Sequence, residues 1–282
     1  MPNAADQQIK TVAIIGVGLI GGSFGLAIRK QGFTGEIIGV SSPAVIQKAT
    51  ECGVISRGVS LENACREADL LYLADKVDGI IRTLHTIGPL VRSDCMVTDA
   101  GSTKGAIVKA ARLSLNSATF LGGHPMAGKE LRGVENADPE LFRGRPYVLT
   151  GTLRESPLVA EFEQLLQKLE VQIVRMSPEE HDTAVAFTSH LPQLLSTALA
   201  KTLAEQNTDA LRNVAGPGLL DMTRLALSSP DLWSSILRTN SEPVTRALEA
   251  FISTLNFIQS RLTDDSIEKD FVEAAALARR IR

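Results

Sequence analysis

A histidine between glycines is the side chain of this sequence best placed to exchange a proton. The run Gly122-Gly-His-Pro-Met-Ala-Gly128 surrounds His124 with small residues, and we expect a loop in which a bulky ligand can approach the imidazole. Because histidine titrates at about pH 6.5, it can serve as acid or base at neutral pH. Ser102, in the upstream run Thr98-Asp-Ala-Gly-Ser-Thr-Lys104, has two interpretations: it caps the N-terminus of a helix, or it orients His124.

Two polar runs in the second half of the chain are further candidates for a ligand site. Thr188-Ser-His-Leu-Pro-Gln193 contains His190 and Gln193 beside a proline that kinks a helix, so a packed kink with a buried histidine explains the run equally well. Arg224 has a planar guanidinium that matches a carboxylate, although Asp221 is close enough in sequence to pair with it at the surface. Neither run is decisive by itself.

A glycine-rich run near the start predicts a dinucleotide site. It reads GVGLIG, follows the apolar run 12–15 directly and leads into a helical pattern, which is the context that dinucleotide-binding glycines require. The first glycine permits a tight turn, the second lets the backbone approach a pyrophosphate, and the third lets the helix pack against the strand. Free N–H groups at the start of the helix favour the phosphates. The expected cofactor contacts in this run are Gly16, Gly18, Leu19, Ile20 and Gly21.

The position that would read the adenosine ribose lacks a carboxylate. About 20 residues after the glycines, an acidic residue usually binds the ribose 2′-hydroxyl of NAD. This chain has Gly39-Val-Ser-Ser42 there, and the hydroxyls of Ser41 and Ser42 are able to donate to a 2′-phosphate. The missing acid favours NADP over NAD, but no arginine follows to hold the phosphate, so NAD also fits.

The first half of the chain alternates strands with helices. Apolar runs predict strands at 12–15, 36–40, 70–74, 96–98, 119–121, 147–149 and 171–174, and helical patterns cover 19–31, 44–52, 79–87 and 104–113. This alternation predicts a parallel sheet with helices on both faces. After Pro178 the apolar residues recur at helical spacing. The predicted fold class is therefore α/β, with a Rossmann-like parallel sheet domain over 1–175 followed by an all-helical domain over 176–282.

Composition excludes several classes of partner. The 282 residues include 29 Lys and Arg against 32 Asp and Glu, and so lack the basic excess that suits nucleic acid or an anionic membrane. The three cysteines have no CxxC spacing, which indicates a reducing compartment and no metal site. The uncharged stretch 11–28 has a marginal length for a membrane span, but its five glycines weaken a helix. We expect a cytoplasmic protein.

The motifs together resemble one enzyme family. GVGLIGGS, TDAGSTK, GGHPMAG, SHLPQ and DMTR occur in this order, and they are similar to the motifs of the prephenate and arogenate dehydrogenases of tyrosine biosynthesis. The resemblance covers the chain from Val12 to about Phe257. It implies an N-terminal Rossmann-like domain, a helical domain that forms a homodimer, and an oxidative decarboxylation. In that reaction a hydride leaves C4 of a cyclohexadienol for the nicotinamide, and carbon dioxide leaves C1.

The resemblance also assigns roles to single residues. It makes His124 the catalytic histidine that bonds the C4 hydroxyl, Ser102 its support, and His190, Gln193, Arg224, Glu130 and Asp221 the residues at the substrate. Two places depart from the family. Asp75-Lys76 replaces a small residue and a proline that face the cofactor, which leaves Lys76 able to reach a phosphate. Gly216-Pro-Gly replaces a stretch rich in serine and glycine.

The choice between substrates rests on one position. Glutamine at Gln193 resembles family members that accept arogenate, which carries an ammonium group where prephenate carries a keto group. With the missing ribose acid, this favours an enzyme that uses NADP and accepts arogenate. Two alternatives remain in the sequence: another dehydrogenase with the β-hydroxyacid dehydrogenase architecture, and a nicotinamide-binding sensor without catalytic activity.

Overall fold

A mixed sheet flanked by helices forms the first part of the chain. The structure is a computed structural model and describes residues 8–129, 131–151, 154, 156–206, 208–263 and 266–281. The strands are β1 (Thr11–Ile15), β2 (Glu36–Val40), β3 (Arg57–Gly58), β4 (Leu70–Leu73), β5 (Met96–Asp99), β6 (Thr119–Pro125), β7 (Pro146–Thr150) and β8 (Gln172–Arg175). Their helices are α1 (Leu19–Lys30), α2 (Pro43–Glu51), α3 (Leu61–Glu67), α4 (Val77–Ile87), α5 (Gly105–Ser114), α6 (Pro157–Lys168) and the 3₁₀ turn η2 (Val134–Asn136).

The strand order places the carboxyl ends of the central strands at one edge. The sheet runs β3-β2-β1-β4-β5-β6-β7-β8, with β1 parallel to both β2 and β4. The predicted Rossmann-like sheet is confirmed and is mostly parallel, with one reversal that was not predicted: β7 runs antiparallel to β6, and β8 follows β7 in parallel. The order changes direction beside β1, and such a switch point is where doubly wound sheets bind ligands.

The two faces of the sheet have separate apolar cores. Because side chains alternate along a strand, Ile14 packs with α1 and α6 on one face, whereas Ala13 packs with α3, α4 and α5 on the other. On the first face Phe24 of α1 stacks on Tyr72 of β4, with ring centroids 4.0 Å apart. Strands buried on both faces explain why the sequence shows apolar runs rather than alternation.

The expected loop around His124 is a strand instead. Gly122 and Gly123 lie within β6, which pairs with β5 on one side and β7 on the other. A Cβ atom at Gly123 would lie 2.5 Å from the carbonyl oxygen of Asp99, and one at Gly122 would lie 2.4 Å from Oγ1 of Thr150. The small residues are therefore there to let β6 fit between its neighbours, and they hold His124 on rigid backbone.

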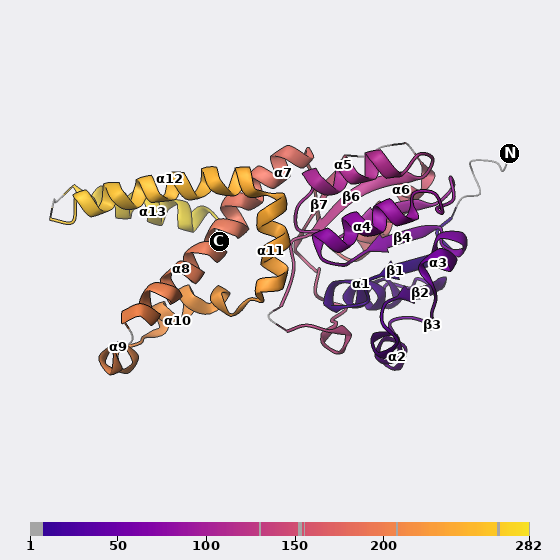
Figure 1. The fold of residues 1–282 in the computed structure, drawn as a ribbon, viewed down its shortest axis with the longest axis horizontal. Coiled ribbons are helices and arrows are strands. Elements are labelled where there is room, and N and C mark those ends of the chain that lie inside the picture. Colours follow the sequence, from indigo (N-terminus) through magenta and orange to yellow (C-terminus); the bar gives the residue numbers. More distant parts are fainter. Residues whose placement is uncertain are drawn as a thin grey trace.

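The second part of the chain is helical and extends away from the sheet (Figure 1). Its elements are α7 (Pro178–Val185), the π-helical turn η3 (Ala186–His190), α8 (Leu191–Gln206), α9 (Asp209–Asn213), α10 (Pro217–Thr223), the 3₁₀ turn η4 (Arg224–Leu227), α11 (Pro230–Thr239), α12 (Ser241–Ser260) and α13 (Ile267–Arg280). The long helix α12 starts beside α7 and α11 and extends away from the sheet, α13 follows it in the chain, and α11 contacts α4. The predicted helical character of this part is confirmed, and the division after residue 175 stays a prediction.

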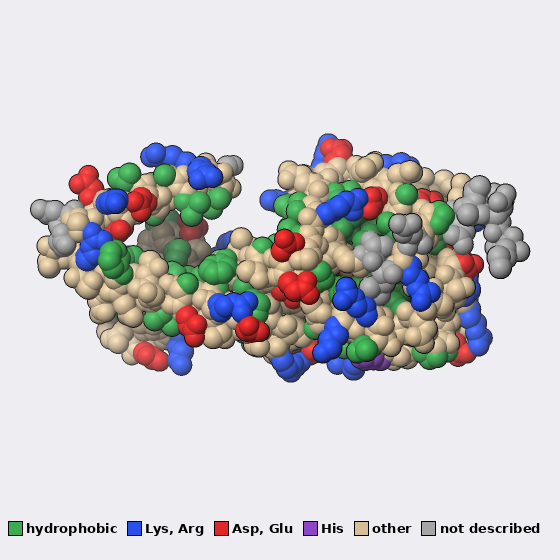
Figure 2. All heavy atoms as spheres, turned by 90° about the horizontal axis from the view of Figure 1, so that it is seen from above, with side chains coloured by type: hydrophobic (Ala, Val, Ile, Leu, Met, Phe, Trp, Pro, Cys, Tyr) green, Lys and Arg blue, Asp and Glu red, His purple; other side chains and the backbone are tan. Residues whose placement is uncertain are grey.

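The helical part buries little of its apolar surface. Among the described residues, the buried members of its own core cluster are Ala186, Val244 and Ala247. Figure 2 shows hydrophobic side chains spread over the surface of this part. Among the described residues, 14 of the 17 exposed large apolar side chains lie beyond residue 176. None of the described helices is both long and apolar enough to cross a membrane.

Candidate active site

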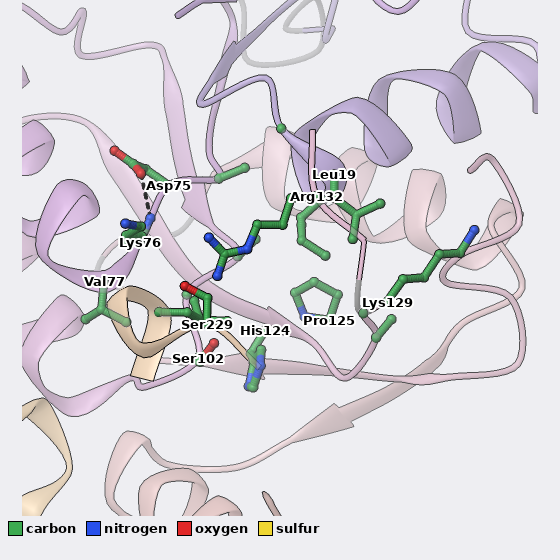
Figure 3. Close-up of a pocket in the computed structure, with 18 of the residues that line it drawn as sticks. Leu19, Asp75, Lys76, Val77, Ser102, His124, Pro125, Lys129, Arg132 and Ser229 are labelled. Carbon is green, nitrogen blue, oxygen red and sulfur yellow. Dashed lines mark hydrogen bonds between the residues drawn. The ribbon is translucent and has the colours of Figure 1, made fainter. Parts of the chain in front are cut away.

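A cavity of about 370 Å³ lies where the carboxyl ends of the strands meet the helical part. Its walls include His124 at the end of β6, Ser102 after β5, and Ser228, Ser229 and Leu232 from the helical part. Figure 3 shows the labelled side chains that face this space. The volume lies in the usual range for a small-molecule site, and both parts of the chain are needed to enclose it.

The imidazole of His124 begins a buried chain of hydrogen bonds. Its Nδ1 is 2.8 Å from Nε2 of His181, and Nδ1 of His181 is 2.8 Å from Oδ1 of Asp182. Asp182 also accepts backbone N–H groups of Lys104 and Gly105, at 2.7 and 2.8 Å, where α5 begins. The sequence analysis missed His181 and Asp182. A histidine and an aspartate next to each other, just after the capping box of α7, indicate a hydrogen-bonded pair. Their other partners, His124 and the start of α5, lie far away in the sequence.

The surroundings of His124 favour its neutral form. Burial lowers the pKa of this imidazole well below its usual value of 6.5, and His181, Lys104 and His190 lower the pKa further. A neutral imidazole with Nδ1 engaged has one nitrogen left for the cavity. It can therefore accept a proton from a bound hydroxyl group.

A buried ion pair fixes the backbone beside His124. The ammonium of Lys104 donates to a carboxylate oxygen of Asp99 and to the carbonyl oxygen of Gly123, the latter at 2.6 Å. Asp99 in turn accepts the backbone N–H groups of Gly101 at 2.8 Å and Gly123 at 3.1 Å. Burial lowers the pKa of Lys104, whereas the Asp99 carboxylate opposes that shift. The pair joins β5, β6 and the start of α5, a role the sequence analysis did not give to either residue.

Ser102 lies in the cavity wall with His124, as Figure 3 shows. Within the part of the chain that the structure describes, no hydrogen bond links the two side chains, and the group bonded to the imidazole is His181. The predicted support of His124 by Ser102 stays a prediction.

A second cavity, of about 390 Å³, adjoins the glycine-rich turn. Gly16 has a φ of +91°, a conformation that favours glycine, and Gly18 stands at the N-terminus of α1, where a Cβ atom would meet nothing within 4 Å. Gly21 is packed against the first strand, since a Cβ there would lie 2.4 Å from the carbonyl oxygen of Gly16. Leu19 and Ile20 line the first cavity. The turn therefore connects the two cavities, as a dinucleotide that reaches from adenosine to nicotinamide requires.

The far end of the second cavity carries groups of both signs. Ser41 lines it, while Ser42 caps α2 and is not among the described lining residues. Lys48 and Glu135 also line it, with Nζ of the lysine 3.8 Å from a carboxylate oxygen of the glutamate. Lys48 was not predicted from the sequence, because it is seven residues after Ser41 and only the helix α2 places both at one cavity.

The predicted substrate residues of the helical part lie outside the described lining of the first cavity. His190 is buried, and the amide of Asn240 donates to its Nδ1 at 3.1 Å. Burial lowers the pKa of His190 to about 4, and His181 adds to this effect while Asp182 opposes it. Arg224 and Asp221 are exposed, on η4 and α10. Their predicted convergence with His124 is therefore not seen among the residues that enclose this cavity. Glu130 lies outside the described residues.

Gln193 is buried with only part of its amide satisfied. Its Nε2 donates to the carbonyl oxygen of Leu225 at 2.8 Å, while its Oε1 has no hydrogen-bond partner among the described residues. The buried indole N–H of Trp233 also has no hydrogen-bond partner among the described residues. Unpartnered buried polar atoms are costly and often mark a place where a ligand binds.

Positive side chains border the first cavity. Arg132, Lys129 and Lys76 belong to its lining, and Figure 3 shows the guanidinium of Arg132 reaching toward Lys76 and Ser229. Lys76 also lies 3.7 Å from Asp231 of α11. A guanidinium at the mouth suits an anionic ligand, and the sequence analysis did not identify Arg132.

Two family models together match most of the chain. The model described as "Prephenate dehydrogenase, nucleotide-binding domain" matches residues 24–175, and the model described as "Prephenate dehydrogenase, dimerization domain" matches residues 177–276. Among curated proteins, the chain is 34% identical to a prephenate dehydrogenase of Lactococcus lactis subsp. cremoris, covering 94% of this chain and 75% of that protein.

Solved structures give the same result. The chain is similar to a prephenate dehydrogenase from Aquifex aeolicus in complex with hydroxyphenyl propionate and NAD+, with a TM-score of 0.89, 31% identity, and coverage of 98% of this chain and 99% of that one. It is also similar to the Synechocystis arogenate dehydrogenase, with a TM-score of 0.77, 29% identity and 96% coverage of both chains.

Proposed function

The chain belongs to the prephenate dehydrogenase family, and from this premise we propose that it oxidatively decarboxylates prephenate, arogenate or both in tyrosine biosynthesis. The observation that carries the proposal is the buried imidazole of His124 in the wall of a cavity that adjoins the dinucleotide turn, and burial lowers the pKa of this imidazole well below 6.5. Gly16 and Gly18 of the glycine turn would hold the dinucleotide, and its nicotinamide would supply the acceptor for the hydride from C4 of the substrate.

The residues of the chain have a limited chemical task. The free nitrogen of His124 accepts the proton of the C4 hydroxyl as carbonyl character develops there. Loss of carbon dioxide from C1 then makes the ring aromatic, which supplies the driving force. Positioning and one proton transfer are what the protein contributes. Ser102, in the same wall, is proposed to assist at the hydroxyl end of the substrate.

We propose Arg132 and Arg224 as ligands of the substrate carboxylates. Arg132 borders the cavity directly. Arg224 begins η4, and the chain leads directly from this turn into Ser228 and Ser229 of the cavity wall. The resemblance adds His190, Asp221 and Glu130 to the proposed set of substrate residues.

The buried amide of Gln193 supports activity with arogenate. Its unpartnered carbonyl oxygen is a hydrogen-bond acceptor, and the ammonium group of arogenate is a donor that the keto group of prephenate cannot replace. We therefore propose arogenate as an accepted substrate. Steady-state rates with both substrates test this, and a protein that turns over prephenate but not arogenate would contradict it.

We further propose NADP as the preferred cofactor, with NAD as the alternative. Ser41 and Lys48 line the second cavity and are able to donate to a 2′-phosphate, and Ser42 lies next to them at the start of α2. Glu135 opposes this choice, although its pairing with Lys48 reduces its charge toward a ligand. If Lys48→Ala weakens NADP binding and leaves NAD binding unchanged, the proposal holds; equal effects on both would contradict it.

The assembly and location follow from the same family. We propose that two copies of the chain form a homodimer through the helical part. This part begins at residue 176 and follows a dinucleotide-binding domain over 1–175. We also propose that the protein lies in the cytoplasm. The exposed apolar side chains of the helical part support this contact.

Kinetics of two variants test the proposed activity. His124→Asn removes the base and should lower kcat by roughly 100-fold to 10,000-fold. Arg224→Ala should mainly raise KM, because a carboxylate contact exists both before and during the reaction. A wild-type protein that turns over neither prephenate nor arogenate, with either cofactor, would contradict the proposal.

A further inference from the structure

His181 is a buried histidine to which the proposed reaction gives no role. It lies in the first turns of α7, after the capping box that Ser177 and Glu180 form, and its exposed fraction is zero. Its Nε2 lies 2.8 Å from Nδ1 of His124, and the two rings meet edge to face with centroids 5.0 Å apart. A residue placed in this way acts on the substrate only through His124.

Asp182 determines the direction of the hydrogen bonds. Its oxygens accept backbone N–H groups of Lys104 and Gly105, and Oδ1 also lies 2.8 Å from Nδ1 of His181. Because an ionised carboxylate only accepts, His181 donates from Nδ1. A neutral His181 then has only an acceptor at Nε2, so the shared proton of the next bond sits on Nδ1 of His124.

We propose that His181 and Asp182 are positioning residues that hold His124 as its Nδ1–H tautomer, with an unprotonated Nε2 for the substrate. The inference rests on the proposed function, because a base at the C4 hydroxyl needs that free nitrogen. When His124 takes the proton, the Asp182 carboxylate stabilises the new charge through His181. Among the described residues, Lys104 and His190 also act on His124 electrostatically, and the ammonium of Lys104 is paired with Asp99.

Two substitutions of His181 separate this role from simple packing. His181→Phe keeps a ring but removes the acceptor, and kcat should fall roughly 10-fold to 100-fold with little change in KM for the cofactor. His181→Gln offers an amide oxygen to the Nδ1–H group of His124 and should recover most of that loss. The matched control is His85→Gln, because His85 is exposed and bonds Ser114 on the surface. Unchanged kcat in folded His181→Phe would overturn the proposal.

Nitrogen NMR of the imidazoles gives a second readout that needs no turnover. The chain has four histidines, so substitution assigns each signal. Wild-type protein should show the proton of His124 on Nδ1, and His181→Phe should change this distribution. If His181→Phe fails to fold, the spectra of His181→Gln and of the wild type still test the proposal. A proton on Nε2 of wild-type His124 would overturn the proposal. An inactive wild type with the proton on Nδ1 would contradict only the proposed function.

Discussion

Burial, rather than a charged neighbour alone, makes His124 a base at neutral pH. The imidazole is buried, and this lowers its pKa well below 6.5, with His181 and Lys104 adding to the shift. A base works only in its unprotonated form, so lowering its pKa extends the active range toward acid. The position of the acid limb of activity therefore reports the environment of one side chain.

The expected pH profile follows from that shift. As pH falls from 8, kcat/KM should stay level through pH 6.5 and decline only well below it, because His124 remains neutral in the free protein. The measurement is the rate at limiting substrate across this range, in buffers of constant ionic strength. Half-maximal activity at or above pH 6.5 would show that the imidazole keeps an ordinary or raised pKa.

The lowered pKa of His190 makes the folded protein less stable as the pH falls. Its pKa is about 4 when folded and about 6.5 when unfolded, so below pH 6.5 the unfolded chain binds more protons and the free energy of unfolding falls. Between pH 7 and pH 5 the loss from this residue should be about 1–2 kcal/mol, since one pKa unit corresponds to about 1.4 kcal/mol.

Urea unfolding of a matched variant isolates this contribution. His190→Gln keeps an acceptor for the amide of Asn240 but does not titrate. Its stability should therefore change less between pH 7 and pH 5 than that of the wild type. Parallel stability changes in both proteins would refute the linkage, even if both lose stability because His124 acts in the same direction.

At the scale of elements, the approach of α1 to β1 determines the dinucleotide turn. Gly21 has no room for a side chain, because a Cβ would lie 2.7 Å from a methyl group of Ile14, whereas a Cβ at Gly18 meets no atom within 4 Å. The two glycines of this motif therefore have different functions. One permits packing of the helix, and the other leaves space for the ligand.

Alanine at each glycine should separate these effects. Gly21→Ala should lower the free energy of unfolding by roughly 1–3 kcal/mol, as overpacking does, and weaken cofactor binding as well. Gly18→Ala should leave the melting temperature nearly unchanged and weaken cofactor binding alone, since the backbone φ of −96° suits alanine. Melting curves and cofactor titrations measure both; equal melting temperatures for the two variants would contradict the assignment.

The sequence predicts elements better than it predicts their pairing. Apolar runs identified the buried strands, because strands covered on both faces need apolar residues throughout. The reversal between β6 and β7 leaves no mark on that pattern, and β3 is too short to show one. Gly122 and Gly123 suggested a loop, because small residues suit both loops and crowded strands.

The same limit applies to the site. The motifs identified His124 and the glycine turn by local spacing. His181 is 57 residues from His124 in the sequence, and only the docking of α7 against the sheet brings them together. Arg132 and Lys48 look like ordinary surface residues until the backbone places them at a cavity.

At the scale of the whole molecule, the helical part needs a partner to cover its surface. In the described part of this region, exposed apolar residues include Leu255 of α12 and Phe271 of α13. Leu113, near the end of α5, is about as exposed as Phe271 and more exposed than Leu255, but it belongs to the sheet domain. Leu113 therefore serves as the control for substitutions at Leu255 and Phe271, because it is exposed outside the helical part.

Light scattering of three proteins tests the dimer. Wild-type protein should have about twice the chain mass of 30.2 kDa. A Leu255→Glu, Phe271→Glu double variant should shift toward the single-chain mass, because charges oppose burial of the interface. Leu113→Glu should stay dimeric. A wild type that is monomeric at micromolar concentration would contradict the proposed assembly.

The second cavity is lined only by residues between Gly16 and Glu135, whereas the first also requires Ser228, Ser229 and Leu232. Recognition of the adenosine end thus belongs to one continuous region, and enclosure of the reacting ring belongs to two. Gly18, Ala74, Asp75 and Gly133 line both cavities, whereas Ser41 and Lys48 line the second cavity and not the described wall of the first, so substitutions at these two positions can change the coenzyme without entering the pocket for the organic acid. Evolution is free to alter the oxidant and the metabolite in separate steps.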